Sequence, residues 1–250
     1  MAVNTKILAD SVVEKLSAEL KKYNLSYFKS IYVCGSYCRG DWLNSNSDLD
    51  IHTICDDNQS DLREENFGLL KSLVDEALRG RDFPAHSESI EYGFSSLENI
   101  PKTYEEALKP SPYAYFSTLM FDLKENHITL YGEEINGLLP QAPNPRENAE
   151  DWLLSLINRT ENLKRGDFRL YWITYKIILA AQILFGEITI NKYKILELYQ
   201  KHIPEFPAKY FGEIVIRNYL GSVYPERPPV IFDEDEYKNF ISELSKLIKT

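Results

Sequence analysis

The most informative residues of this chain for chemistry lie in one string, Ile31–His52, which reads IYVCGSYCRGDWLNSNSDLDIH. An apolar run predicts a strand that enters a Gly35-Ser36 turn, and a polar loop leads to a second strand that begins with Asp48 and Asp50. Because side chains alternate along a strand, both carboxylates point to one face, roughly 6.6 Å apart along the backbone. Proteins hold Mg²⁺ with one or two carboxylates together with substrate phosphates, so this pair predicts a divalent cation site.

The Gly35-Ser36 turn supplies the other half of such a site. Glycine lets a phosphate approach the backbone closely, and the serine hydroxyl adds a hydrogen bond. Together with Asp48 and Asp50, the turn indicates metal-assisted transfer of a nucleotide's phosphoryl group. The alternative is a solvated strand edge, since Asp-x-Asp after Ser and Asn is common in turns. His52 continues the same face and is assigned no role.

A third strand is predicted at Ala85–Phe94, where two kinds of residue alternate. The face expected to pack on the core carries Glu88, Ile90, Tyr92 and Phe94. Glu91 therefore projects from the opposite face, among small neighbours. If Asp48 and Asp50 share that face, Glu91 is a third carboxylate that ligates a metal or takes the proton from an attacking hydroxyl. A solvated glutamate is the alternative, and Glu88 is a second candidate whose face is expected to be buried.

The elements around these strands predict an α+β fold in two domains. Further elements are predicted from periodicity at Leu8–Leu20, Leu62–Leu78 and Pro112–Lys124 (helices) and at His127–Gly132 (strand). Gln141–Pro145 has the composition of a linker, and the periodicity beyond it is helical throughout. We therefore expect an N-terminal domain of residues 1–142, with a mixed sheet and helices, followed by a C-terminal all-helical bundle of residues 143–250.

Composition limits the partners. The chain has 250 residues, 44% of them hydrophobic, as expected for a packed globular protein. Its net charge of −10, without a long Lys/Arg cluster, argues against a nucleic-acid substrate. A negative field attracts cations, which favours a small cationic acceptor.

Other features bear on the compartment. Three cysteines make a disulfide framework unexpected, and the chain opens on an amphipathic helix instead of a signal peptide. The most apolar stretch, Leu170–Phe185, is too short to span a membrane. We expect a cytoplasmic protein with no membrane partner, and the sequence leaves the oligomeric state open, with a monomer favoured.

The string from Gly35 to Asp50 resembles the signature of the DNA polymerase β-type nucleotidyltransferase superfamily, which is a Gly-Ser, a gap of this size and then Asp-hydrophobic-Asp. The resemblance implies that Asp48 and Asp50 hold two Mg²⁺ ions. It also implies that Gly35 and Ser36 grip the phosphates of the nucleotide, with ATP as the co-substrate.

Several later strings are similar to those of the aminoglycoside nucleotidyltransferases that adenylylate streptomycin and spectinomycin. These strings are His127–Glu134, Gly166–Arg169, Phe185–Thr189 and Tyr219–Gly221. The chain departs from that family at Glu161–Arg165, where the family has a tryptophan that contacts streptomycin. The resemblance implies transfer of AMP from ATP to a hydroxyl of a small, cationic acceptor, with release of pyrophosphate.

This closer resemblance also implies roles for individual residues. Glu91 corresponds to the catalytic base, and Ser36 and Ser47 to serines on the phosphate side. Asp167 corresponds to an acid of the helical domain that faces the drug, and Lys192 to a lysine that reaches ATP. The alternatives are a helix N-cap for Asp167 and an ordinary surface lysine for Lys192.

Two other functions remain as alternatives. The same fold could transfer a nucleotide to a side chain of another protein, as some toxin–antitoxin nucleotidyltransferases do. A non-catalytic nucleotide-sensing module is the third possibility, and the intact Gly-Ser and Asp-x-Asp set argues against it.

Overall fold

The computed structural model describes residues 5–42, 47–79, 90–109, 114–160, 168–184, 186–187, 190–191, 193–194, 197–198, 201 and 234–247. The chain divides by its packing into two compact units, Met1–Ala142 and Pro143–Thr250.

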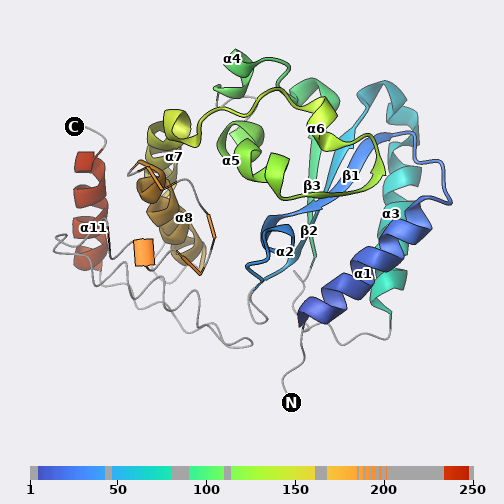
Figure 1. Cartoon of the computed structure of the whole chain (residues 1–250), viewed down its shortest axis with the longest axis horizontal. Helices are drawn as coiled ribbons and strands as arrows, with labels where there is room; N and C mark the ends of the chain where they lie inside the picture. The colour runs from blue at the N-terminus through green and yellow to red at the C-terminus, as the bar shows by residue number, and fades with distance from the viewer. Residues whose placement is uncertain are drawn as a thin grey trace. The chain divides into compact units, whose positions relative to one another are not determined.

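The N-terminal unit is built on a four-stranded mixed sheet with the strand order β3-β2-β1-β4 (Figure 1). The strands are β1 (Phe28–Cys34), β2 (Leu49–Cys55), β3 (Ile90–Ser96) and β4 (Ile128–Gly132). Strand β1 pairs antiparallel with both β2 and β4, whereas β2 pairs parallel with β3. A mixed sheet combined with helices confirms the predicted α+β class.

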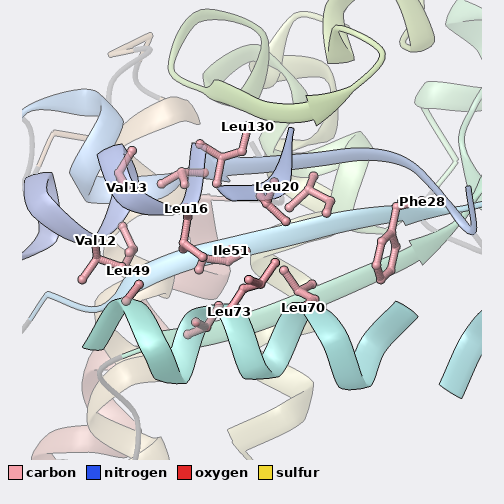
Figure 2. Close-up of a cluster of buried hydrophobic side chains, with 14 of the residues drawn as sticks. Val12, Val13, Leu16, Leu20, Phe28, Leu49, Ile51, Leu70, Leu73 and Leu130 are labelled. Carbon is pink, nitrogen blue, oxygen red and sulfur yellow. The ribbon is translucent and has the colours of Figure 1, made fainter. Parts of the chain in front are cut away.

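One face of this sheet is covered by α1 (Thr5–Leu20) and α3 (Arg63–Leu78). Apolar residues repeat every three to four positions along both helices, which places them on one stripe that meets the sheet. Figure 2 shows Leu16 of α1, Ile51 of β2 and Leu73 of α3 in the resulting cluster. Because Leu49 and Ile51 point into this cluster, the alternate residues of β2 must point to the opposite face.

The opposite face is apolar over part of its area. Tyr32 of β1 and Ile54 of β2 pack there in a second buried cluster with Met120 and Leu123 of helix α5 (Ala114–Glu125). The shorter elements of this unit are α2 (Gly35–Arg39), α4 (Tyr104–Ala107), α6 (Ile135–Leu138) and 3-10 helices at Asp57–Leu62 and Leu97–Asn99. Towards the start of β2 this face carries polar side chains, which build the site described below.

The predicted burial of two residues on the third strand, β3, is wrong. We expected Tyr92 and Phe94 to pack on the core, but these side chains are 42% and 65% exposed. The reason is that β3 lies at the edge of the sheet, where a strand has one neighbour instead of two. Ile90 is half-buried against the core, and the candidate Glu88 lies outside the described residues.

The regular secondary structure described in the C-terminal unit is entirely helical. These are α7 (Pro145–Thr160), α8 (Phe168–Leu184) and α11 (Glu234–Leu247), of which α7 and α8 pack together. The end of α8 is buried all round, as expected for a helix inside a bundle, and α11 buries Phe240 completely. Within the described ranges, no helix combines the length and the apolar character needed to cross a membrane.

Candidate metal and nucleotide site

The predicted Gly-Ser turn is the start of a short helix. Strand β1 runs directly into α2, which begins at Gly35 and is closed by Gly40. The φ angles of these two glycines are +71° and +75°, in the left-handed region where other residues are strained. A Gly-Ser pair suits a turn as well as such a helix start, so the sequence did not distinguish them.

Gly35 is also required by a close approach to Asp50. A Cβ atom added at position 35 would lie 1.8 Å from Oδ2 of Asp50, far inside any van der Waals contact. The approach follows from the register, because Cys34, the residue before Gly35, is paired with Asp50 across β1 and β2. The carboxylate of Asp50 therefore lies against the backbone at the start of α2.

Glu91 lies beside Asp50 on the neighbouring strand. The parallel register of β2 and β3 pairs the two residues directly. With His52 they form a group in which one ligand atom of each residue lies within 4.8 Å of those of the other two. Asp50 and His52 are half-buried and Glu91 is exposed, so the group is open to solvent on the side of β3.

Three other predicted residues lie around this group. Asp48 and Ser47 are half-buried and directly precede β2. Within the described residues, the group of possible metal ligands consists of Asp50, His52 and Glu91 and does not include Asp48. The role of Asp48 as a metal ligand therefore stays a prediction. Ser36 is only 3% exposed, and its Oγ has no hydrogen-bond partner within the described part of the chain. Buried hydroxyls normally have a partner, so the Ser36 hydroxyl keeps a hydrogen-bonding capacity that the described residues do not use.

His52 is the site residue that sequence reasoning missed. His52 follows Asp50 by two residues on β2, so both side chains lie on the same face of the sheet. Its neighbours across the two strand pairings are Tyr32 of β1 and Gly93 of β3. Burial lowers the pKa of His52 to about 4, so the ring is neutral near pH 7 and offers a nitrogen lone pair. The available signal was the spacing of two residues between His52 and Asp50.

Arg39 connects α2 to the rest of the domain. Its Nη1 donates a hydrogen bond of 2.7 Å to Oδ2 of Asp122 on α5, and its Nε lies 3.4 Å from the fully buried Asp41. Burial raises the pKa of Asp122, although the guanidinium of Arg39 opposes this effect. Asn126 completes the network by donating to Oδ1 of Asp122 at 3.0 Å. The network fixes α2, and hence Gly35, relative to α5.

Cys38 does not offer a reactive thiol near this site. The three cysteines are free, and Sγ of Cys38 donates to the carbonyl of Val33 at 3.3 Å. Burial raises the pKa of the Cys38 thiol to about 12, with a contribution from the negative charge of Asp50. Both features argue against Cys38 as a thiolate nucleophile.

The donor set of the site fits a divalent cation. Two carboxylates and an imidazole are metal ligands in proteins, and Gly35 leaves the space that the Asp50 carboxylate occupies. The predicted ligand contacts Asp167 and Lys192 lie outside the described residues, so their roles stay predictions.

Part of the chain matches a known protein family. Residues 13–93 match the family described as nucleotidyltransferase domain. The match begins within α1 and ends within β3, so it contains Gly35, Ser36, Asp48, Asp50 and Glu91. No curated protein matches the chain.

Proposed function

With residues 13–93 identified as a nucleotidyltransferase domain, and the chain thus as a nucleotidyltransferase enzyme, we propose that it transfers AMP from ATP to a hydroxyl of a small cationic acceptor. An aminoglycoside or aminocyclitol antibiotic is such an acceptor. The observation that carries the proposal is the direct pairing of Asp50 with Glu91 next to the Gly35 backbone.

The metal in this proposal is Mg²⁺, held by Asp50 and Glu91, with Asp48 as the further predicted ligand. When bound, Mg²⁺ would lower the pKa of the acceptor hydroxyl and neutralise charge on the phosphates and the departing pyrophosphate. Gly35 and Ser36 begin α2, and the backbone of Gly35 lies against the Asp50 carboxylate, which supports the proposal that this turn binds the phosphates.

Glu91 is the proposed general base. Its carboxylate is exposed, unlike the half-buried Asp50, so an acceptor can reach it from solvent. The acceptor oxygen would form a bond to the α-phosphorus as the bond from that phosphorus to the bridging oxygen breaks. Pyrophosphate leaves, and the hydroxyl proton passes to Glu91. Most of the rate enhancement would then come from positioning and charge neutralisation.

The negative net charge of the chain supports a cationic acceptor. The chain has a formal net charge of −10, and a negative field raises the local concentration of cations and disfavours nucleic acids. The resemblance to aminoglycoside adenylyltransferases, in which Asp167 corresponds to an acid facing the drug, points to the same class of acceptor. Lys192 would reach ATP in the same scheme.

The test is pyrophosphate release from each of the four nucleoside triphosphates, with and without streptomycin, spectinomycin and other aminocyclitols. Asp50→Asn serves as the blank. Asp61→Asn is the matched control, because it makes the same change of charge at an exposed residue beyond the far end of β2. Release that needs ATP, Mg²⁺ and one of the drugs supports the proposal and identifies the acceptor.

Other outcomes contradict the proposal in defined ways. Labelled AMP on a protein band instead of a small molecule would establish a protein-modifying enzyme. ATP binding without turnover across the whole panel would contradict the proposed class of acceptor.

A further inference from the structure

We propose that His52 is a ligand of the cation held by Asp50 and Glu91, and that this nitrogen ligand makes the site prefer Mn²⁺ or Co²⁺ to Mg²⁺. The inference rests on the proposed function in one respect, namely that the Asp50 and Glu91 pair binds a divalent cation. It goes beyond that function because it adds a ligand and specifies which metals the site selects.

The distances permit one ion to reach all three side chains. One donor atom each from Asp50, His52 and Glu91 lies within 4.8 Å of the others. Ligands on opposite sides of one ion, each about 2.1 Å away, are about 4.2 Å apart, and adjacent ligands are closer. Small side-chain rotations therefore suffice to close the group around a cation.

The imidazole is held in this position from both sides. Tyr32 lies on one side, with 5.8 Å between the two ring centroids, and the backbone of Gly93 lies on the other. A Cβ atom at position 93 would lie 2.3 Å from Nδ1 of His52, so the ring occupies space that exists because residue 93 is glycine. A ring fixed between two strands is a preorganised ligand, which pays little entropy when it binds a metal.

The mixed donor set determines which metals we expect. Carboxylates suit Mg²⁺ and Mn²⁺, whereas an imidazole favours first-row transition metals, whose affinities rise from Mn²⁺ to Co²⁺ and beyond. Mg²⁺ gains little from a nitrogen ligand because it prefers oxygen and dehydrates reluctantly. His52 should therefore matter for Mn²⁺ and Co²⁺ and hardly at all for Mg²⁺.

The experiment measures metal binding directly, on the full chain freed of metal with a chelator. Pulsed electron paramagnetic resonance of bound Mn²⁺ detects coupling to an imidazole nitrogen in the wild-type protein, so this readout needs no variant. Titration with Co²⁺, followed by visible absorption, and competition with Mg²⁺ are then compared among wild type, His52→Ala and His52→Asn. His127→Ala is the matched control, since His127 contacts the Leu123 carbonyl and Glu134 instead.

We expect nitrogen coupling in wild type, and a loss of about tenfold or more in Mn²⁺ and Co²⁺ affinity in both His52 variants. The Mg²⁺ affinity should change by less than about twofold, and His127→Ala should behave as wild type. Bound Mn²⁺ without nitrogen coupling, or equal Co²⁺ affinity and spectrum in wild type and folded His52→Ala, would overturn this inference alone. If wild type binds none of the three ions even with ATP, the proposed metal role of Asp50 and Glu91 fails as well.

Discussion

Replacing Gly35 by alanine tests the geometry on which the site depends. The φ angle of +71° costs an alanine roughly 1–2 kcal/mol, because its Cβ approaches the following carbonyl. In addition, the new Cβ would lie 1.8 Å from Oδ2 of Asp50. An overlap of this depth forces the carboxylate to rotate away or the turn between β1 and α2 to shift, and both changes take Asp50 away from Glu91.

Gly40→Ala provides the matched control. Gly40 has nearly the same φ, +75°, but an added Cβ there meets no atom within 4 Å. The two variants therefore share the backbone strain, and they differ in whether Asp50 is displaced. Gly40→Ala should lower the free energy of unfolding by about 1–2 kcal/mol, measured by urea denaturation followed by circular dichroism, and Gly35→Ala should lower it further because the overlap with Asp50 adds to the backbone strain.

The two variants should differ in cation binding and activity. We expect Gly40→Ala to keep the wild-type Mn²⁺ affinity and rate of pyrophosphate release to within about twofold, since it leaves the carboxylate group untouched. Gly35→Ala should lose at least about tenfold in both, because one ligand is displaced. If folded Gly35→Ala binds Mn²⁺ as tightly as Gly40→Ala, the position of Asp50 does not control the site and the reasoning is refuted.

Three further predictions concern single residues around the site. Glu91→Gln should lower the rate of transfer by about 10²–10⁴-fold in a pyrophosphate assay while leaving the unfolding transition unchanged, because the side chain is exposed and is the proposed base. Asp122→Asn should lower the free energy of unfolding by about 3 kcal/mol in urea denaturation, because it leaves the mostly buried Arg39 with less compensating charge. The Cys38 thiol, with a pKa of about 12, should be about one part in ten thousand ionised at pH 8. Its reaction with a disulfide reagent should therefore be slow in the native protein, accelerate about tenfold per pH unit up to pH 12, and become fast in denaturant.

Each of these predictions has a control or a contradicting result. Glu98→Gln changes an exposed glutamate near the end of β3 and should keep full activity. Lys22→Ala breaks an ion pair between Lys22 and Glu19 at the surface and should leave the urea unfolding curve close to that of wild type. An Asp122 variant as mild as Lys22→Ala would mean that the buried network does not stabilise α2. A Cys38 thiol that reacts at pH 8 as fast in the native as in the denatured protein would show that the thiol is not buried.

Local pattern predicted the strands of the sheet but not their order. The apolar run Ile31–Cys34 and the alternating residues of Asp48–Ile54 locate β1 and β2 to within a few residues. The edge position of β3, and with it the exposure of Tyr92 and Phe94, depends on which strands pair. Pairing is a long-range property that periodicity does not encode.

The site residues, too, were predicted from local pattern, whereas their arrangement depends on long-range pairing. Asp50 and Glu91 were selected by residue type and by face, but their direct pairing needed the parallel register of β2 and β3. The ion pair of Arg39 and Asp122 joins residues 83 positions apart, and no local signal links them. The spacing of His52 from Asp50 was a signal in the sequence. The register that places Gly93 opposite His52, and so leaves room for the imidazole, was not.

The central claim is that the carboxylate of Asp50 is required for nucleotidyl transfer. The most direct measurement is transfer of labelled AMP from ATP in the presence of Mg²⁺ by Asp50→Asn, compared with wild type and Asp61→Asn at equal circular dichroism. The account predicts that Asp61→Asn retains the wild-type rate and that Asp50→Asn, although folded, loses transfer. Retention of more than a few per cent of the wild-type rate by Asp50→Asn would contradict the account.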